Sequence, residues 1–576
     1  MRKYIEMVYK ENFKRVLPNI SLLLVAIFVG ITVSIVAQIF ILAAKNLFNF
    51  IFHNDSFSIT ITVFDQTLNL IPILICVPSS ILVGLLMYFL KIPRWFGPAD
   101  TIYAAHNKAG TLDLKGGFGS TLASFISISG GASVGIYGPL VHFGATVSSF
   151  IRRQKFIPNI PHDIIIGCGV AAAISAGFGA PLAGIIFAHE TVLRHFSMKA
   201  VTALALSSMA ANFAASEIGI VVPTLLLEEI PFKISEVLPS LTIIGPLSAI
   251  VAIVFMKSMI FLGTIPQKIK IKSWQAPVIA GLVCGLCGMV FDEILGLGSD
   301  TLMIVITSEQ NYYYLFMLLI GKLFLTSLCI GFGFFGGTFS PALFLGGIVG
   351  ALVFQLPILS LQPELITILA VSGMAAVSSS VIGAPITAII LVLELTGSYE
   401  YAIAATFPIV ICSYITSRIF GNSLFDKQLI SRGIPISKGR EQIILNEVLI
   451  ENYVDENYTN FTVNTSINNA IKSFTNNKTT EGYIVSIDNK YIGKISLIDI
   501  INKKDDLLKN FISKKPIVID PKSNLLYVIK SLSNFVGESI PIVNKETNEM
   551  IGIISENDVL KAYLEVSDEI NQIEKH

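Results

Sequence analysis

Three short segments rich in glycine and proline have the composition of sites that bind an anion without a fixed positive charge. They read GPADT (97–101), GIYGP (135–139) and GGTFSP (336–341), and each leads into an apolar run of helical character. The first turn of a helix presents unpaired N–H groups and the positive end of the helix dipole. An anion held by dipoles can leave again, which suits permeation. Together the three segments predict an anion site.

Long apolar segments must position these breaks. The chain has 576 residues, of which 53% are hydrophobic and 14% charged. About 20 apolar residues cross a bilayer as a helix, and the candidates are 20–44, 70–91, 200–216, 240–263, 276–291, 312–330 and 401–417. Uncharged stretches interrupted by Gly, Pro and Ser lie at 116–151, 323–363 and 365–393. Irregular backbone at membrane depth persists only where it is buried or lines a cavity, so the site is expected there.

The interrupted stretches are repeated. GAPLAGIIFAHE (179–190) recurs as GAPITAIILVLE (383–394) at an offset of 204, and YGPLVHFGA (137–145) is echoed by SPALFLGGI (340–348). Two halves with matching breaks are typical of a repeat-built transporter, whose site lies where broken helices meet at the membrane midplane.

The charge distribution divides the chain in two. Residues 441–576 hold 20 acidic and 14 basic residues, whereas the first 440 hold 20 acidic and 26 basic ones. Neither part is basic enough to predict a nucleic-acid partner. The tail has its own repeat, because YIGKISLIDI (491–500) matches MIGIISENDV (550–559) at an offset of 59. Each unit is expected to fold as strand, helix, strand, strand, helix, and two such units pair into one domain.

The segments KLFLTSLCIGFGFFGGTFSPALFLGG (322–347) and GAPITAIILVLELTGSYEY (383–401) resemble the CLC family of chloride channels and anion–proton antiporters. The tail resembles a pair of CBS domains. The resemblance implies an all-α polytopic membrane protein with inverted repeats and broken helices, followed by a small cytoplasmic α/β CBS pair. We expect a membrane domain at 1–436 and a tail at 437–576, with CBS units at about 452–506 and 513–566. It also implies a homodimer.

The resemblance assigns residues to an anion path. The family's G-x-F-x-P element matches Gly337 to Pro341, whose backbone amides are expected to face the anion, and its Gly-Ser-Gly-Ile-Pro motif falls on Gly97 to Thr101. Pro98 replaces the anion-binding serine, and among relatives proline at this place accompanies a preference for nitrate over chloride. Phe425 replaces a coordinating tyrosine. The expected anion-binding residues are Gly97, Pro98, Ile136, Tyr137, Gly138, Thr338, Phe339 and Phe425.

This sequence departs from the family's pattern at the two acids of the proton route. The gating glutamate of the Gly-Lys/Arg-Glu-Gly-Pro motif is replaced by Tyr137, and the second acid of a Glu-Glu pair is replaced by Thr191, after Glu190. A phenol has an ordinary pKa of about 10, so it can donate a hydrogen bond but does not readily exchange a proton near neutral pH. We therefore expect transport of small monovalent anions, chloride or nitrate, through a channel or uncoupled pathway gated by Tyr137.

Two alternatives remain open. An anion–proton antiporter would need substitute groups such as Asp100 or His189, although His142 and His189 are better explained as packed core histidines. A membrane-anchored CBS sensor of adenylates would need only intact apolar helices, which the broken segments disfavour. An enzyme is not expected, because the apolar region has no Ser/His/Asp set and no HExxH motif. The Cys284/Cys287 pair lacks a second pair of ligands and predicts no metal site.

Four further polar residues have competing interpretations. Asp100 could replace a lost carboxylate or cap the following helix. Lys322 could attract anions at an inner pore mouth or extend to the membrane interface. Glu190 and Glu394 end equivalent repeated segments, so we expect a structural or interfacial role for both.

The tail contains two G-x-x-S-x-x-D frames. They place Ser496 with Asp499 and Ser555 with Asp558. In CBS pairs, which the tail resembles, such residues can hold the ribose and phosphate of ATP, ADP or AMP, so an adenine nucleotide is a candidate ligand, and no cofactor is required for conduction. A basic amino-terminal flank predicts that both termini are cytoplasmic, in what we expect to be a prokaryotic plasma membrane. The expected partners of the protein are inorganic anions and the lipid bilayer.

Overall fold

The structure is a computed structural model. It describes the whole chain apart from residues 1, 53–58, 64–65, 108–110, 156, 158–159, 219–231, 358–361, 435, 437–438, 504–506, 513–516, 534 and 576, and apart from the side chains of 2–19, 62–67, 569 and 571–575. The predicted domain edges at 437, 506 and 513 therefore fall outside the described residues. The chain divides into two units. The membrane unit comprises Met1–Ala105 and Ala109–Arg432, and the tail unit comprises Gly433–His576 with residues 106–108.

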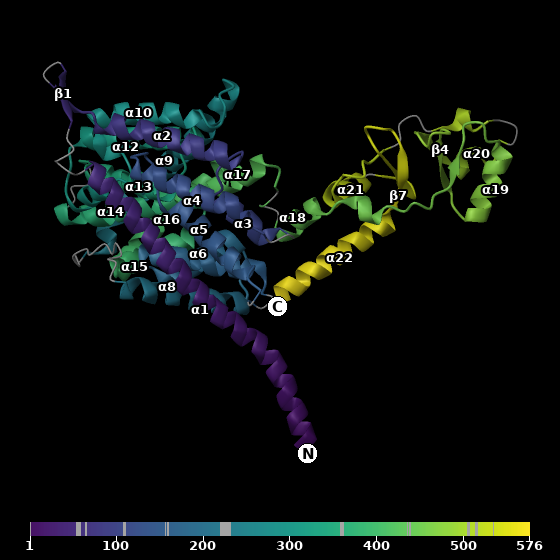
Figure 1. Cartoon of the computed structure of the whole chain (residues 1–576), viewed down its shortest axis with the longest axis horizontal. Coiled ribbons are helices and arrows are strands. Elements are labelled where there is room, and N and C mark those ends of the chain that lie inside the picture. Colours follow the sequence, from purple (N-terminus) through teal and green to yellow (C-terminus); the bar gives the residue numbers. More distant parts are fainter. Residues whose placement is uncertain are drawn as a thin grey trace. The chain divides into compact units, whose positions relative to one another are not determined.

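The predicted apolar segments of the membrane unit are helices (Figure 1). Because these helices are apolar along most of their length, they are stable in a bilayer or buried among each other. Six described segments are long and apolar enough to cross a membrane: 20–52, 71–90, 234–268, 312–331, 363–382 and 399–431. The long helices are α1 (Arg2–Phe52), α2 (Ile71–Leu90), α4 (Leu114–Ser129), α8 (Met198–Glu217), α9 (Ile234–Lys268), α10 (Ala276–Val290), α12 (Tyr312–Gly331) and α16 (Tyr399–Ile419).

Three shorter helices of the first half have equivalents in the second half. In the first half these are α5 (Tyr137–Arg152), α6 (His162–Phe178) and α7 (Pro181–Phe187), and their equivalents in the second half are α13 (Phe339–Phe354), α14 (Ile366–Ile382) and α15 (Pro385–Thr396). A proline starts α7 and α15, where its missing N–H costs nothing. Short elements complete the unit: β1 (Thr60–Val63), β2 (Gln66–Asn69), α3 (Pro98–His106), the π-helix η2 (Ala188–Leu193), η3 (Asp292–Ile294), α11 (Ser299–Thr307), η4 (Pro363–Leu365) and α17 (Leu424–Ser431).

Glycines let the paired helices approach closely. Gly144 of α5 lies against Gly169 of α6, and the equivalent Gly346 of α13 lies against Gly373 of α14. A Cβ atom at any of these four positions would overlap the backbone carbonyl of its partner. The same close contact in both halves places the starts of α5 and α13 equivalently, which matters because they carry the predicted anion site.

The tail unit has the predicted element order. Its first half contains β3 (Asn460–Phe461), α19 (Ile467–Asn477), β4 (Glu481–Val485), β5 (Tyr491–Ser496) and α20 (Leu497–Ile500), with sheet order β3-β4-β5. Its second half contains α21 (Leu525–Leu532), the antiparallel pair β6 (Ser539–Val543) and β7 (Met550–Ser555), and α22 (Glu556–Lys575). The first strand of this half is reduced to a parallel bridge from Ile519 to Ile542. Also present are α18 (Arg440–Glu447), η6 (Ile450–Tyr453) and η7 (Leu508–Phe511).

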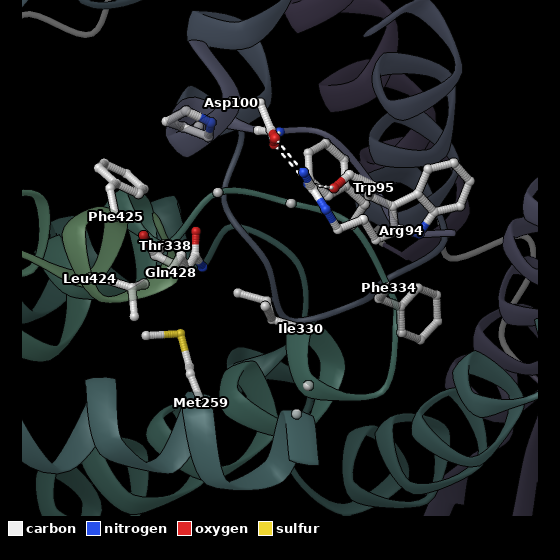
Figure 2. Close-up of a pocket in the computed structure, with 18 of the residues that line it drawn as sticks. Arg94, Trp95, Asp100, Met259, Ile330, Phe334, Thr338, Leu424, Phe425 and Gln428 are labelled. Atoms are coloured by element: carbon white, nitrogen blue, oxygen red, sulfur yellow. Dashed lines mark hydrogen bonds and ion pairs between the residues drawn. The ribbon is translucent and has the colours of Figure 1, made fainter. Parts of the chain in front are cut away.

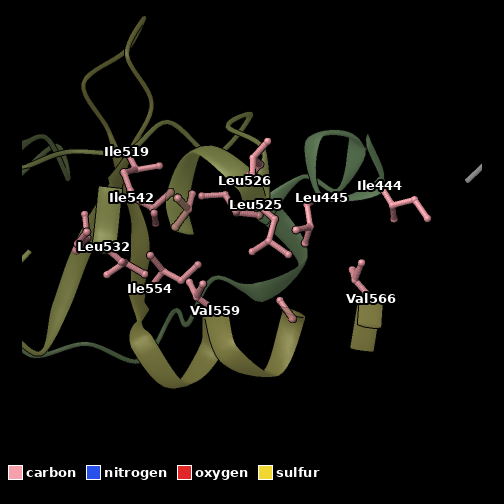
Figure 3. Close-up of a cluster of buried hydrophobic side chains, with 14 of the residues drawn as sticks. Ile444, Leu445, Ile519, Leu525, Leu526, Leu532, Ile542, Ile554, Val559 and Val566 are labelled. Carbon is pink, nitrogen blue, oxygen red and sulfur yellow. The ribbon is translucent and has the colours of Figure 1, made fainter. Parts of the chain in front are cut away.

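The two halves of the tail meet through equivalent turns. Asn489 and Asn548 both have positive φ, 56° and 59°, and each side-chain amide donates to a carbonyl of the other half, of Met550 at 2.9 Å and Tyr491 at 3.1 Å. The Tyr483 hydroxyl bonds Ser539, and burial raises the pKa of this phenol above its usual range. Figure 3 shows the apolar core of the second half, to which α18 also contributes.

Candidate anion-binding cavity

A cavity of about 670 Å³ in the membrane unit gathers most of the predicted site residues. Its lining includes Gly97, Pro98, Tyr137, Gly138, Thr338, Phe339 and Phe425, and Figure 2 shows Thr338 and Phe425 on one side of it, with Arg94 and Asp100 on another. The side chain of the remaining predicted residue, Ile136, is buried beside the start of α5 and does not line the cavity.

The two equivalent breaks are bonded to each other. Gly135 N–H donates to the Gly337 carbonyl at 2.7 Å, and Gly337 N–H donates to the Gly135 carbonyl at 2.5 Å. Gly138 needs to be glycine here, since a Cβ would lie 2.8 Å from the Cα of Gly337. The prediction that all amides from Gly337 to Pro341 face an anion is therefore wrong at both ends. The Gly337 amide is already paired, and proline has no N–H.

The next amides remain available. Among the described residues, the N–H groups of Tyr137, Gly138, Thr338 and Phe339 have no hydrogen-bond acceptor, as is normal for the first turn of a helix. These residues line one cavity, so the starts of α5 and α13 offer unpaired donors and two dipole ends to the same space. This arrangement can hold an anion and can release it.

Tyr137 lies in an aromatic cluster at this point. Its ring stacks on Phe178 with centroids 3.6 Å apart and an interplanar angle of 17°, and it meets Phe339 edge-on at 5.8 Å. Phe178 and Phe339 are also perpendicular, at 5.2 Å. The Tyr137 hydroxyl has no partner among the described residues. The stacking fixes the ring beside the open amides, and Phe178, which sequence reasoning missed, is what holds it there.

Asp100 accepts hydrogen bonds from three residues at another part of the cavity. Its carboxylate accepts two hydrogen bonds from Arg94, at 2.9 and 2.5 Å, one from Arg432 at 3.0 Å and one from the Gly97 amide at 2.9 Å. An acid that reaches back from the third helical position to the N-cap amide is a helix cap, so that interpretation of Asp100 is confirmed. The Gly97 amide, predicted to bind the anion, is thus occupied by the carboxylate of Asp100.

Three residues considered for the proton route, Thr191, His142 and His189, lie outside the cavity. Thr191 is buried at 2% exposure and does not line it. His142 is buried, bonds Thr101 at 2.8 Å and stacks on Phe96. His189 is buried, bonds the carbonyl of His195 at 2.9 Å and stacks on Phe196. Both histidines are packed in the protein interior, as expected.

Glu190 and Glu394 cap each other's half of the membrane unit. Glu394 accepts hydrogen bonds from the Leu182 and Ala183 amides at the start of α7, both at 2.8 Å. Glu190 accepts from the Ile386 and Thr387 amides at the start of α15, at 3.0 and 2.8 Å, and from the Thr387 hydroxyl at 2.7 Å. The expected structural role of both acids is confirmed. Each carboxylate pairs with the dipole of the equivalent helix.

The position of Lys322 contradicts both predictions made for it, at an inner pore mouth and at the membrane interface. Its side chain is fully buried, and Nζ donates to the carbonyls of Ile294 at 3.0 Å and Gly296 at 2.8 Å, with Leu295 at 3.5 Å. It lies neither in the cavity nor at the edge of the unit. Local sequence around position 322 gives no signal of this role, because the acceptors come from a loop more than 25 residues earlier.

The predicted nucleotide-binding residues of the tail contact neighbours that are close in sequence. The Ser496 hydroxyl accepts from the Ile498 amide at 3.3 Å at the start of α20, which also carries Asp499. The Ser555 hydroxyl donates to the Asp558 carboxylate at 2.6 Å at the start of α22. Both frames therefore lie where a strand passes into a helix. No group of three or more metal-ligating side chains occurs in the described part of the chain, and all six cysteines are free.

The helical membrane unit and its cavity define an integral membrane protein of an anion-transport fold. A family model described as "Voltage gated chloride channel" matches residues 79–418, and one described as "CBS domain" matches 508–565. Since the first match covers more than half of the chain, this protein belongs to the voltage gated chloride channel (CLC) family.

Individual relatives are more distant. The chain is 27% identical over 335 residues to an H(+)/Cl(-) exchange transporter of Vibrio cholerae, covering 55% of this chain and 69% of the relative. It is 27% identical over 328 residues to the chloride channel protein CLC-e of Arabidopsis thaliana, covering 52% and 46%. The solved structure of a slow cyanobacterial Cl-/H+ antiporter matches with a TM-score of 0.62 at 19% identity, covering 72% of this chain and 98% of that one. A eukaryotic CLC transporter matches at 0.62 and 16%, covering 94% and 98%.

Proposed function

We propose that this protein passes small monovalent anions, chloride or nitrate, across a membrane without stoichiometric proton exchange. One observation carries the proposal. Asp100 is the only acidic residue among the described residues that line the cavity, and no histidine lines it. Two guanidinium groups hold the Asp100 carboxylate in its charged form, so it is a poor proton carrier.

The anion is bound by backbone in this proposal. The open amides of Tyr137, Gly138, Thr338 and Phe339 surround it, and the Tyr137 hydroxyl donates a further hydrogen bond. Pro98 and Phe425 line the cavity without offering a side-chain donor. Tyr137, fixed by stacking on Phe178, narrows the path and acts as its gate.

An antiporter is the main alternative, because the Vibrio cholerae relative is named as an H(+)/Cl(-) exchanger. The test is anion efflux from proteoliposomes loaded with chloride or nitrate, with external pH recorded simultaneously. The expected result is anion efflux with no proton movement against a proton gradient. Uphill proton movement in a fixed ratio to the anions would overturn the proposal.

Two variants of Tyr137 sharpen this test. Tyr137→Glu places a titratable carboxylate at the start of α5, so efflux is expected to fall at least tenfold at neutral pH and to recover as the pH is lowered. Tyr137→Phe keeps the stack on Phe178 and removes the donor, so efflux is expected to change only a few-fold and to stay independent of pH. A pH-independent Tyr137→Glu variant would place this residue outside the path.

The tail and the assembly add two proposals. An adenine nucleotide binds the tail through Ser496, Asp499, Ser555 and Asp558, which is supported by the two equivalent strand-to-helix positions. ATP-dependent thermal stabilisation of the full-length protein, lost in Asp558→Ala, tests it. A homodimer is proposed because it is typical of the family to which the chain belongs, and light scattering in detergent tests it.

A further inference from the structure

The Asp100 cluster has more positive charge than its carboxylate neutralises. Arg94 and Arg432 contribute two positive charges and Asp100 one negative charge. All three line the cavity, and the side chains of Arg94 and Arg432 are 40% and 28% exposed. One positive charge therefore remains uncompensated by the described residues that form the cluster, in a space continuous with the predicted anion path.

Arg432 also keeps donors free. Only its Nη1 atom has a hydrogen-bond partner among the described residues, the Oδ1 atom of Asp100 at 3.0 Å. Its Nε and Nη2 groups have none. Arg94, by contrast, uses Nη1 and Nη2 on the carboxylate, donates to the Trp95 carbonyl and lies over the Phe96 ring at 4.9 Å. An incoming anion therefore finds its open donors on Arg432.

We propose that Arg94 and Arg432 form a second anion-binding site in this cavity, and that the Asp100 carboxylate is a tethered competitor for it. The ligand is a small monovalent inorganic anion, the same class that the proposed function transports, so this inference deepens that function and rests on it. A carboxylate and a halide or nitrate ion use the same guanidinium donors. The chain's own acid thus occupies part of a receptor for its substrate.

The hydrogen bonds of Asp100 indicate how the exchange proceeds. Three of its four bonds go to Arg94 and Gly97, and only one goes to Arg432. An anion can take the place of Oδ1 on Arg432 while Asp100 keeps its other three bonds. The cluster is then electrically neutral, because one anion compensates its excess positive charge. Asp100 limits how tightly the anion is held and so keeps it exchangeable.

The test is equilibrium binding of chloride to the purified full-length protein in detergent, at constant ionic strength. Asp100→Asn keeps the size of the side chain and an acceptor for Gly97 but removes the competing charge, so chloride affinity is expected to rise about tenfold. Arg432→Gln is expected to lose one equivalent of bound chloride. The Asp100→Asn/Arg432→Gln double variant is expected to lose the gain, because the gain depends on the free Arg432 donors.

A matched control lies elsewhere in the membrane unit. Asp426 forms a partly buried ion pair with Arg194, and neither residue lines the cavity. Asp426→Asn removes a carboxylate from a guanidinium in the same way, and chloride affinity is expected to stay within twofold of wild type. An equal rise in Asp426→Asn and Asp100→Asn would mean a non-specific charge effect and would overturn the proposal.

Other outcomes are equally decisive. An affinity unchanged in Asp100→Asn, or a gain that persists in the double variant, contradicts the proposal. Arg432→Lys is the replacement test if Asp100→Asn does not yield monodisperse protein. The lysine keeps the positive charge and the ion pair with Asp100 but lacks the free donors, so the chloride affinity is expected to fall several-fold. Binding is measured without proton transport, so a coupled protein would refute the proposed uncoupled function while leaving this result intact.

Discussion

Acidic side chains are held in two different ways in the membrane unit. At the contact between α7 and α15, Glu190 and Glu394 each bind the first amides of the other half's helix, and neither has a basic side chain as a partner among the described residues. In the cavity, Asp100 binds two guanidinium groups and one amide. The first arrangement is repeated by the internal symmetry of the unit, and the second occurs once in the part of the unit that the structure describes.

The difference separates structure from function. A carboxylate on a helix N-terminus compensates only the partial charge of the dipole, so the pair Glu190 and Glu394 leaves nothing for a ligand. The cluster of Asp100 has one positive charge in excess and open donors on Arg432. We infer that the symmetric acids stabilise the fold, whereas the asymmetric acid regulates what binds in the cavity.

The largest stability effect is expected from removing both symmetric caps. Glu190→Ala with Glu394→Ala leaves four helix-start amides without their acceptors, at about 1–2 kcal/mol for each cap and about 2–4 kcal/mol in total. Denaturant unfolding in detergent measures the change, and chloride affinity is expected to be unaffected. A loss of chloride binding in folded protein would contradict the division between the two regions.

A smaller stability effect is expected at the asymmetric acid. Asp100→Ala frees two guanidinium groups that are already partly exposed and leaves the Gly97 amide without its acceptor, so the free energy of unfolding should fall by about 1–2 kcal/mol. Chloride affinity should rise in this variant, whereas a folding defect would lower it. The same unfolding and binding measurements apply, and a loss of stability as large as that of the double cap variant would make Asp100 a structural residue.

The smallest effect tests the symmetry itself. Thr387 donates a hydroxyl to Glu190 at 2.7 Å, and the equivalent position in the first half is Ala183, which has no such donor. Thr387→Val removes this extra bond and is expected to cost about 0.5–1.5 kcal/mol of the free energy of unfolding. Unfolding of Thr387→Val in a Glu190→Ala background should show no further loss, since the acceptor is then gone.

Sequence patterns predicted much of the fold because the causes are local. The helices, the breaks at 130–136 and 332–338, and the alternating elements of the tail follow from apolar runs and from glycine and proline positions. The same is true of seven of the eight expected anion-site residues, which line one cavity. Residue type decides these features within a few positions of the chain.

The predictions that the structure contradicts concern hydrogen-bond partners. The Gly97 amide faces Asp100, the Gly337 amide is paired with Gly135, and Lys322 is buried against three carbonyls. None of these partners is evident from the local pattern, because a buried donor binds whichever acceptor the tertiary packing brings to it.

The sequence by itself determined which long segments are helical, that two halves are equivalent, and that both acids of the family's proton route are replaced by Tyr137 and Thr191. Only the tertiary structure decided which donors are already in use. Asp100 and Arg432 are 332 residues apart in the chain and meet at 3.0 Å. Their pairing depends on how α3 and α17 pack around one cavity, and a charge left uncompensated by that packing is a property of the assembled fold.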